Sequence, residues 1–200
     1  MTGWTVHSGR AVSLPLDGVD TDQIIPARFM SQPRSAGYGE FLLHDMRQDP
    51  GFPLDAPAAQ GASVLVSGRN FGSGSSREAA VYALVDAGFC AVIAPSFGDI
   101  FSANAVNNGL APIQLSKAEV DLLHSQISAG TSSVDLDLEA GSLSLGRTSF
   151  EFSLDPVWTQ KLIEGWDDID LTHAWTATIA EFRKADRTAR DWAWPKCGPD

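Results

Sequence analysis

The sequence contains few cysteines, few positive charges and no long apolar run. Two cysteines, Cys90 and Cys197, occur in 200 residues, whereas a metal or iron–sulfur site usually needs three or four closely spaced ligands. The chain alone is therefore not expected to bind a metal or cofactor. Asp and Glu outnumber Lys and Arg by 25 to 14, for a net charge of −11. This acidity argues against nucleic acid or an anionic membrane as a partner.

The absence of targeting and membrane signals gives an expected location. No apolar run approaches the roughly 20 residues that span a bilayer, and no signal-peptide pattern opens the chain. We therefore expect a cytoplasmic, reduced protein, with Cys90 as a buried small hydrophobe in the apolar run 89–94. With 44% apolar residues, one domain with a good core is expected over residues 1–185, followed by a C-terminal tail at 186–200.

The pattern of residues 63–94 predicts a strand, a glycine-rich turn, a helix and a second strand. An apolar run at 63–66 precedes the turn, Gly88 is suited to ending the helix, and a second apolar run follows at 90–94. Such a unit implies two parallel strands with a right-handed crossover. The predicted fold is a compact, mixed α/β domain with this parallel unit at its centre.

The rest of the chain supplies strands and helices around that unit. Strands are predicted at 10–16 and 111–115, and alternating apolar and polar residues predict an antiparallel hairpin or meander over 134–154. Helices are predicted at 40–47, 97–108, 156–166 and 170–187, and another helix starts at the capping box of Ser116 and Glu119 and runs to about 129.

The turn at residues 67–78 is the candidate binding site. Ser75 followed by Glu78 resembles a capping box, which predicts a helix start at Ser75 or Ser76. A helix start carries free N–H groups and partial positive charge, so Arg77 there is disfavoured unless an anion is bound. We therefore predict a carboxylate or phosphate site, although an ordinary capped helix would have the same local pattern. The turn matches no common phosphate-binding motif.

A second polar cluster lies at Asp20 and Asp22. These residues follow the Asp17-Gly18 turn signal, so turn and helix-cap chemistry is one interpretation. The other is that they orient a nearby arginine or a substrate group. The sequence leaves both interpretations open.

Three motifs, in the expected order, resemble one known family. They read DTDQIIP at residues 20–26, GRNFGSGSSRE at 68–78, and IAPSFGDIF at 93–101, followed by NGLAPI at 108–113. The chain resembles the small subunits of 3-isopropylmalate dehydratase, the separate swivelling domain of the aconitase superfamily, over nearly its whole length.

The resemblance implies a hydro-lyase that interconverts 2- and 3-isopropylmalate through a dehydrated intermediate in leucine biosynthesis. It implies a heterodimer in which a separate large subunit carries a 4Fe-4S cluster, and a small dicarboxylate as substrate. It assigns Ser75 as the catalytic base and Ser76 and Arg77 as binders of substrate carboxylate. Asp22 matches a polar position near the active site, and Arg28 and Arg34 lie in or near the segment that contacts the substrate's variable group.

Two departures from the family pattern concern the choice of substrate. Ala79 stands where histidine is usual, and the loop at 34–38 has its arginine shifted by one place and lacks a threonine. A related methyl- or alkyl-malate dehydratase subunit is therefore an alternative. Two further alternatives are a stand-alone anion-binding module and a subunit that has lost catalysis and stabilises its partner.

Overall fold

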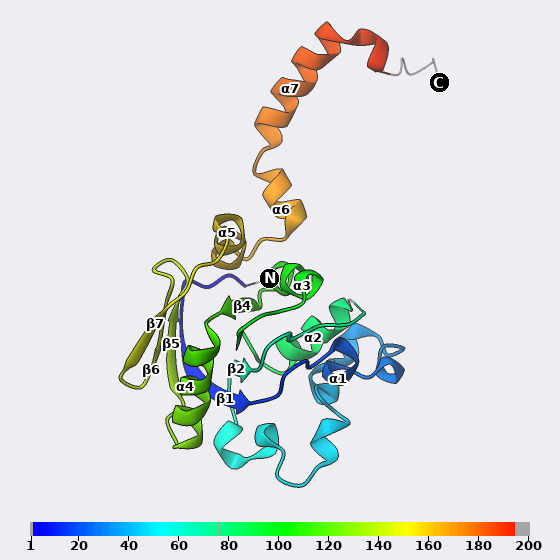
Figure 1. The fold of residues 1–200 in the computed structure, drawn as a ribbon. Coiled ribbons are helices and arrows are strands. Elements are labelled where there is room, and N and C mark those ends of the chain that lie inside the picture. Colours follow the sequence, from blue (N-terminus) through cyan, green and yellow to red (C-terminus); the bar gives the residue numbers. More distant parts are fainter. Residues whose placement is uncertain (1, 76, 195–200) are drawn as a thin grey trace. The chain divides into compact units, whose positions relative to one another are not determined.

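The computed structural model describes residues 2–75 and 77–194 of the chain (Figure 1). The chain divides into two compact units, Met1–Trp166 and Asp167–Asp200. The first unit contains a seven-stranded sheet with the strand order β4-β3-β2-β1-β5-β6-β7. Its strands are β1 (Val6–Leu14), β2 (Val64–Ser67), β3 (Ala91–Ala94), β4 (Ala111–Gln114), β5 (Ser133–Asp137), β6 (Ser142–Leu145) and β7 (Thr148–Glu151).

Strands β1 to β4 are parallel and form the centre of the fold. Strands β2 and β3 are short, apolar and buried over their whole length, as is usual for parallel strands. In β2, Leu65 packs into one apolar core while Val64 and Val66 pack into the other. The helix α2 (Glu78–Asp86) connects β2 to β3, which pair in parallel register. The predicted strand–helix–strand unit and the mixed α/β fold class are confirmed.

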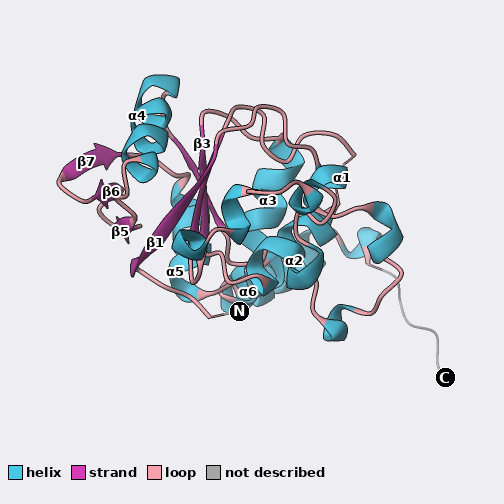
Figure 2. Ribbon diagram, turned by 90° about the horizontal axis from the view of Figure 1, so that it is seen from below, coloured by secondary structure: helices cyan, strands magenta, loops and turns pink. Residues whose placement is uncertain are grey.

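Two groups of elements cover the two faces of the parallel strands β1–β4. Figure 2 shows α1, α2 and α3 on one side of the strands and α4 with β5–β7 on the other. The helices are α1 (Thr21–Ile24), α3 (Asp99–Asn107), α4 (Lys117–Ser128) and α5 (Pro156–Glu164). The predicted capping box at Ser116 and Glu119 is present at the start of α4. Gly88 adopts a left-handed φ of 94° just after α2, as expected of a residue that ends a helix.

Strand β1 is longer than the prediction and has two partners. Its first half, Val6–Arg10, pairs antiparallel with β5, whereas Ala11–Leu14 pairs in parallel with β2. The predicted strand began only at Arg10. After Val6 the first half contains Gly9 and no further β-branched residue, so its sequence has little β propensity. Pairing with the predicted meander β5–β7, which is confirmed as antiparallel, makes it a strand.

The long connection from β1 to β2 contains short 3₁₀ turns in place of the helix predicted at 40–47. The turns there are Gly39–Phe41 and Met46–Gln48. Leu43, between them, has a left-handed φ of 51°, which interrupts any helix. Its N–H donates to the Ile24 carbonyl at 2.8 Å. A tertiary contact has therefore overridden the local helical pattern.

The second unit contains two helices, α6 (Asp168–His173) and α7 (Thr176–Ala189), and a short turn at Asp191–Ala193. The single helix predicted at 170–187 is therefore interrupted at residues 174–175. The predicted domain boundary after residue 185 stays a prediction, and Cys197 lies outside the described residues. Among the helices that the structure describes, none has the length and apolar character needed to cross a membrane.

Cys90 is a half-buried thiol next to β3. Its Sγ donates to the Ser63 carbonyl oxygen at 3.3 Å, and burial raises the pKa of the thiol to about 12. The side chain packs against the core that contains Val64 and Ile93. These contacts agree with the prediction of Cys90 as a small hydrophobe in an apolar run, although it is only partly buried.

The Cys90 thiol should react slowly with alkylating reagents, because the thiolate is the nucleophile. In a Cys197→Ser variant, which leaves one thiol, we expect iodoacetamide at pH 8 to modify Cys90 at least about a hundredfold more slowly than an exposed cysteine of ordinary pKa. Mass spectrometry follows the reaction. Denaturant should restore fast labelling. Equal rates in the folded and unfolded states would show that burial does not protect the Cys90 thiol.

Candidate functional site

The loop between β2 and α2 contains the predicted site, but its helix begins later than predicted. Helix α2 starts at Glu78, and Arg77 is its N-cap, with extended backbone and no side-chain cap hydrogen bond. The predicted capping box of Ser75 and Glu78 is therefore wrong. Gly72 and Gly74 both have left-handed φ values, 71° and 93°, which turn the chain so that Ser75 precedes the helix. Glu78 instead accepts a hydrogen bond from Asn108 at 3.0 Å.

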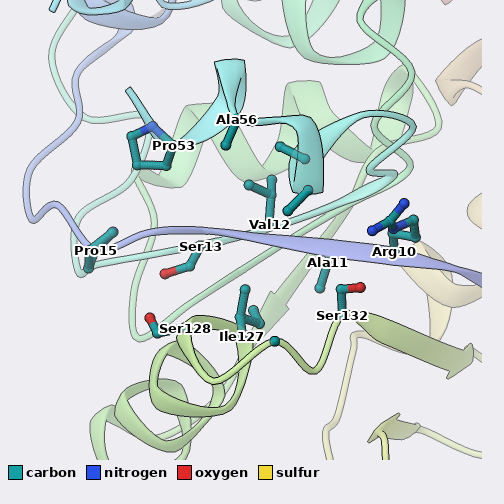
Figure 3. A pocket seen from close by; sticks show the side chains of 13 residues that line it. Arg10, Ala11, Val12, Ser13, Pro15, Pro53, Ala56, Ile127, Ser128 and Ser132 are labelled. Carbon is teal, nitrogen blue, oxygen red and sulfur yellow. The ribbon is translucent and has the colours of Figure 1, made fainter. Parts of the chain in front are cut away.

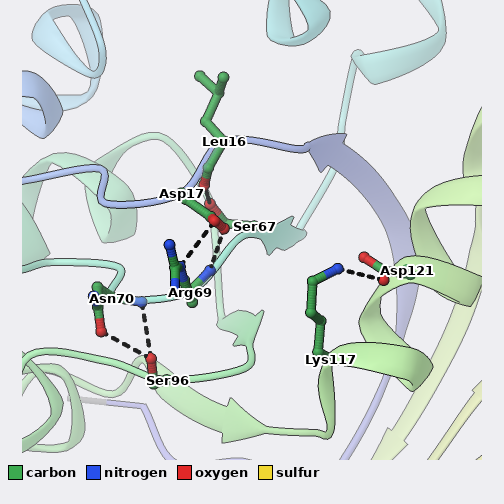
Figure 4. Close-up of polar contacts among 8 residues, drawn as sticks. All are labelled: Leu16, Asp17, Ser67, Arg69, Asn70, Ser96, Lys117 and Asp121. Atoms are coloured by element: carbon green, nitrogen blue, oxygen red, sulfur yellow. Dashed lines mark hydrogen bonds and ion pairs between the residues drawn. The ribbon is translucent and has the colours of Figure 1, made fainter.

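The first part of the loop is fixed by two polar contacts (Figure 4). Asp17 accepts hydrogen bonds from the backbone N–H and the Nε of Arg69, at 2.9 and 3.0 Å. The hydroxyl of Ser96 accepts from the N–H of Asn70 at 2.9 Å and donates to its side-chain oxygen at 3.0 Å. Asn70 adopts a left-handed φ of 57°, a conformation that asparagine accepts better than most residues. The loop therefore leaves β2 on a defined path.

Gly72 lies against an aromatic cluster. The Phe71 ring packs edge-on against the rings of Phe97 and Phe101, with centroids 6.4 and 5.4 Å away. A Cβ on Gly72 would come within 2.2 Å of the Phe101 side chain. The backbone N–H of Gly98 donates to the Phe71 carbonyl at 2.9 Å. The middle of the loop is thus held against α3 and the segment that precedes it.

The second part of the loop is held by residues 19–22, which carry the predicted aspartates. The N–H of Gly72 donates to the carbonyl of Val19 at 2.8 Å, and the N–H of Thr21 donates to the carbonyl of Ser73 at 3.0 Å. The Thr21 hydroxyl donates to the carbonyl of Ser75 at 2.7 Å. Two segments more than 50 residues apart in the sequence therefore form one polar surface.

Asp20 and Asp22 have different roles. The sequence left open whether they cap a helix or orient a nearby arginine, and the structure shows one residue in each role. Asp20 is the N-cap of α1, accepts from the N–H of Gln23 at 2.8 Å and completes a capping box with that residue. Asp22 forms an ion pair with Arg77. Its carboxylate compensates the positive charge of Arg77 at the start of α2. The sequence analysis had predicted that a bound anion would provide this compensation. An anionic ligand at Arg77 would therefore share the guanidinium with Asp22.

The structure brings together three of the predicted site residues: Asp22, Ser75 and Arg77. Ser75 is exposed, and the Arg77 side chain is 26% exposed. Ser76 lies outside the described residues. Ser75 and part of the Arg77 side chain are thus exposed to solvent just before α2, whose N-terminus favours an anion. This arrangement can bind a carboxylate and stabilise negative charge on the serine oxygen.

Arg28 and Arg34 have other partners in the described structure. Arg28 forms an exposed ion pair with Asp45, and this hydrogen-bonded guanidinium lowers the Asp45 pKa to about 2. The Arg34 guanidinium lies 3.6 Å from the centroid of the Tyr82 ring and 4.0 Å from Asp86. Burial and the Glu78 side chain raise the pKa of Tyr82. Arg34 therefore connects its loop to α2, and a substrate-binding role for either arginine stays a prediction.

A separate cavity of about 360 Å³ lies beside β1 and contains none of the predicted site residues (Figure 3). Val12, Pro53, Ala56 and Ile127 are among the mostly apolar residues that line it, and Arg10 is its one charged residue. An apolar pocket is often the first candidate for a ligand site. Although Arg10 and three serines line this cavity, none of the predicted site residues does, so the exposed loop with Ser75 and Arg77 remains the stronger candidate for carboxylate chemistry.

Sequence reasoning missed three features that shape the loop. Thr21 was noticed only as part of a turn, and the contacts of Gly72 with Phe101 and of Asn70 with Ser96 were not predicted. The run of glycines did indicate a special backbone, but nothing local identified the distant partners. In the part of the chain that the structure describes, no group of three His, Cys, Asp or Glu side chains is placed to hold a metal ion.

Comparison with known proteins gives the class to which this sheet and loop belong. The family model described as the aconitase C-terminal domain matches residues 1–118, which include β1 to β4 and the whole loop. A solved structure of 3-isopropylmalate dehydratase from Methanocaldococcus jannaschii is similar to the chain with a TM-score of 0.66 and 29% identity. The match covers 90% of this chain and 99% of that one.

Curated relatives define the family more narrowly. The 3-isopropylmalate dehydratase small subunit of Shouchella clausii is 42% identical over 183 residues, which cover 88% of this chain and 93% of the relative. The protein of the same name from Frankia casuarinae is 45% identical, with coverage of 91% and 94%. The chain belongs to the family of 3-isopropylmalate dehydratase small subunits, as its three motifs predicted.

Proposed function

We propose that this chain is the small subunit of a 3-isopropylmalate dehydratase. The enzyme is a hydro-lyase that interconverts 2- and 3-isopropylmalate by dehydration and rehydration, in the leucine pathway of the cytoplasm. The observation that carries the proposal is the identity of 42 to 45% to small subunits of that name, over about nine-tenths of each chain. The substrate is a small dicarboxylate, and the chain acts only with a large iron–sulfur subunit.

The proposed division of labour leaves acid–base and binding roles to this chain. The large subunit would hold a 4Fe-4S cluster, which supplies a Lewis acid for the substrate hydroxyl. The exposed face of Ser75 and Arg77 would close over the substrate from the other side. Ser75 is exposed in the single chain, as expected of a residue whose site is completed by a partner surface.

Ser75 is proposed to exchange the proton on the carbon next to a substrate carboxylate. A serine oxygen is a weak base, so it requires stabilisation of its anion. The guanidinium of Arg77 and the N–H groups at the start of α2 provide positive potential beside it. Arg77 can also bind a substrate carboxylate by two parallel hydrogen bonds, a geometry that lysine does not offer. Asp22, paired with Arg77, would hold the guanidinium in place for that contact.

Reconstitution tests the proposal. The chain is mixed with the large iron–sulfur subunit of the same organism under anaerobic conditions, and the interconversion of the two isopropylmalates is measured. We expect each subunit alone to be inactive and the mixture to turn over. An active mixture that accepts only a methyl- or other alkyl-malate would favour the alternative dehydratase. Saturable binding of a phosphate ester by the lone chain, with no complex formed, would favour an anion-binding module.

A further inference from the structure

Thr21 is a buried polar residue beneath the candidate catalytic loop. It is 1% exposed, and its hydroxyl donates to the backbone carbonyl of Ser75 at 2.7 Å. Its backbone N–H donates to the carbonyl of Ser73 at 3.0 Å. One residue therefore binds two carbonyl groups of the loop, on either side of Gly74. Neither contact had a signal in the sequence, because 54 residues separate Thr21 from Ser75.

The backbone around Ser75 needs such a constraint. Gly72 and Gly74 have left-handed φ values, and glycine has the largest conformational freedom of any residue. Helix α2 does not fix this part of the loop through a cap, because Arg77 makes no side-chain cap hydrogen bond. The direction of a serine hydroxyl depends on the backbone angles of its own residue, which a bond to its carbonyl restricts.

We propose that Thr21 is the positioning residue of the candidate catalytic serine: its hydroxyl fixes the carbonyl of Ser75 and thereby the direction of the serine Oγ. This inference rests on the proposed role of Ser75. Threonine suits the task because its branched side chain has few rotamers. Its side chain is also buried, and a hydrogen bond from a buried group is stronger than one at the surface. An error of about 1 Å in the position of a catalytic group can cost on the order of a hundredfold in rate.

The test compares Thr21→Val with Thr21→Ser in the reconstituted complex. Valine keeps the shape and loses the hydroxyl, whereas serine keeps the hydroxyl. We expect kcat of Thr21→Val to fall at least about tenfold, with KM within about threefold, and Thr21→Ser to retain at least about half of wild-type kcat. Equal kcat for Thr21→Val and wild type, or equal loss in both variants, would overturn the proposal.

A matched control separates positioning from stability. Thr148 on β7 accepts a 2.7 Å hydrogen bond from Gln126, away from the loop. Thr148→Val therefore loses a bond of the same length and should leave kcat unchanged. If Thr21→Val does not fold, Thr21→Ala, which removes the hydroxyl without adding volume, takes its place under the same criteria.

Hydrogen exchange tests the geometry without the partner subunit. In the lone chain, amides of residues 72–75 should exchange at least about fivefold faster in Thr21→Val than in wild type or Thr21→Ser. Unchanged exchange in Thr21→Val would overturn the positioning role. If the wild-type complex converts neither isopropylmalate, the proposed function fails, while this exchange measurement still decides whether Thr21 holds the loop.

Discussion

Replacing Ser75 with alanine should reduce kcat of the reconstituted enzyme by about 10² to 10⁴-fold, the range that a general base contributes. The reason is that Ser75 is exposed and precedes Arg77 and the start of α2, whose positive charge we propose to stabilise the serine anion, and alanine offers no proton acceptor. KM should change little, because Arg77 still binds the substrate carboxylate. Steady-state kinetics with both isopropylmalates provides the measurement.

Folding and assembly should survive this change. Ser75 is exposed, and substitutions at such surface positions usually alter the free energy of unfolding by less than about 0.5 kcal/mol. Ser8→Ala is the matched control, since Ser8 is an exposed serine on β1 that donates to Asp135. Near-normal kcat in Ser75→Ala would show that the base is another group. Loss of the complex on size exclusion would instead indicate a role for Ser75 in the interface.

Gly72→Ala should be strongly destabilising. The left-handed φ of 71° costs a non-glycine residue about 1–2 kcal/mol. In addition, the new methyl group would overlap the Phe101 ring at 2.2 Å, and overpacking of this kind costs about 1–3 kcal/mol. We therefore expect the free energy of unfolding to fall by about 2–5 kcal/mol, measured by urea denaturation. The surviving folded fraction should also lose activity, because the loop that carries Ser75 must move away from Phe101.

Gly61→Ala is the control for Gly72→Ala. Gly61 has the same φ of 71°, but nothing lies within 4 Å of its added Cβ. The free energy of unfolding of this variant should therefore fall only by the cost of the left-handed backbone, about 1–2 kcal/mol. The difference between the two variants measures the contact with Phe101. If both variants lost the same stability, the aromatic cluster would not be what requires glycine at position 72.

The central fold was predictable because its signals are local. The apolar run before the turn, the glycine after the helix and the second apolar run identified β2, α2 and β3. The same serine-and-glutamate pattern nevertheless gave a correct helix start at Ser116 and a wrong one at Ser75. The chain enters α4 directly, whereas Gly72 and Gly74 divert it before α2. A capping pattern is thus informative only where the preceding backbone allows it.

The site was predictable as a set of residue types but not as an arrangement. The glycines, Ser75 and Arg77 identified the loop, and Asp22 was recognised as a possible partner of an arginine. Nothing near Thr21 in the sequence indicated that its hydroxyl would bond to Ser75. Likewise, the first half of β1 has a weak strand pattern and depends on β5 for its pairing. Both features are set by contacts between distant segments.

The double pairing of β1 has a consequence for biosynthesis on the ribosome. Its parallel partner β2 is translated early, but its antiparallel partner, residues 133–137, emerges about 130 residues after Val6. Until then the backbone groups of Val6–Arg10 lack their strand partner, and unpaired strand backbone is a site for pairing with other chains. His7, Gly9 and Arg10 make this segment less apolar than the buried half of the strand. The polar composition of Val6–Arg10 should therefore discourage aggregation of the nascent chain until β5 has been synthesised and can pair with it.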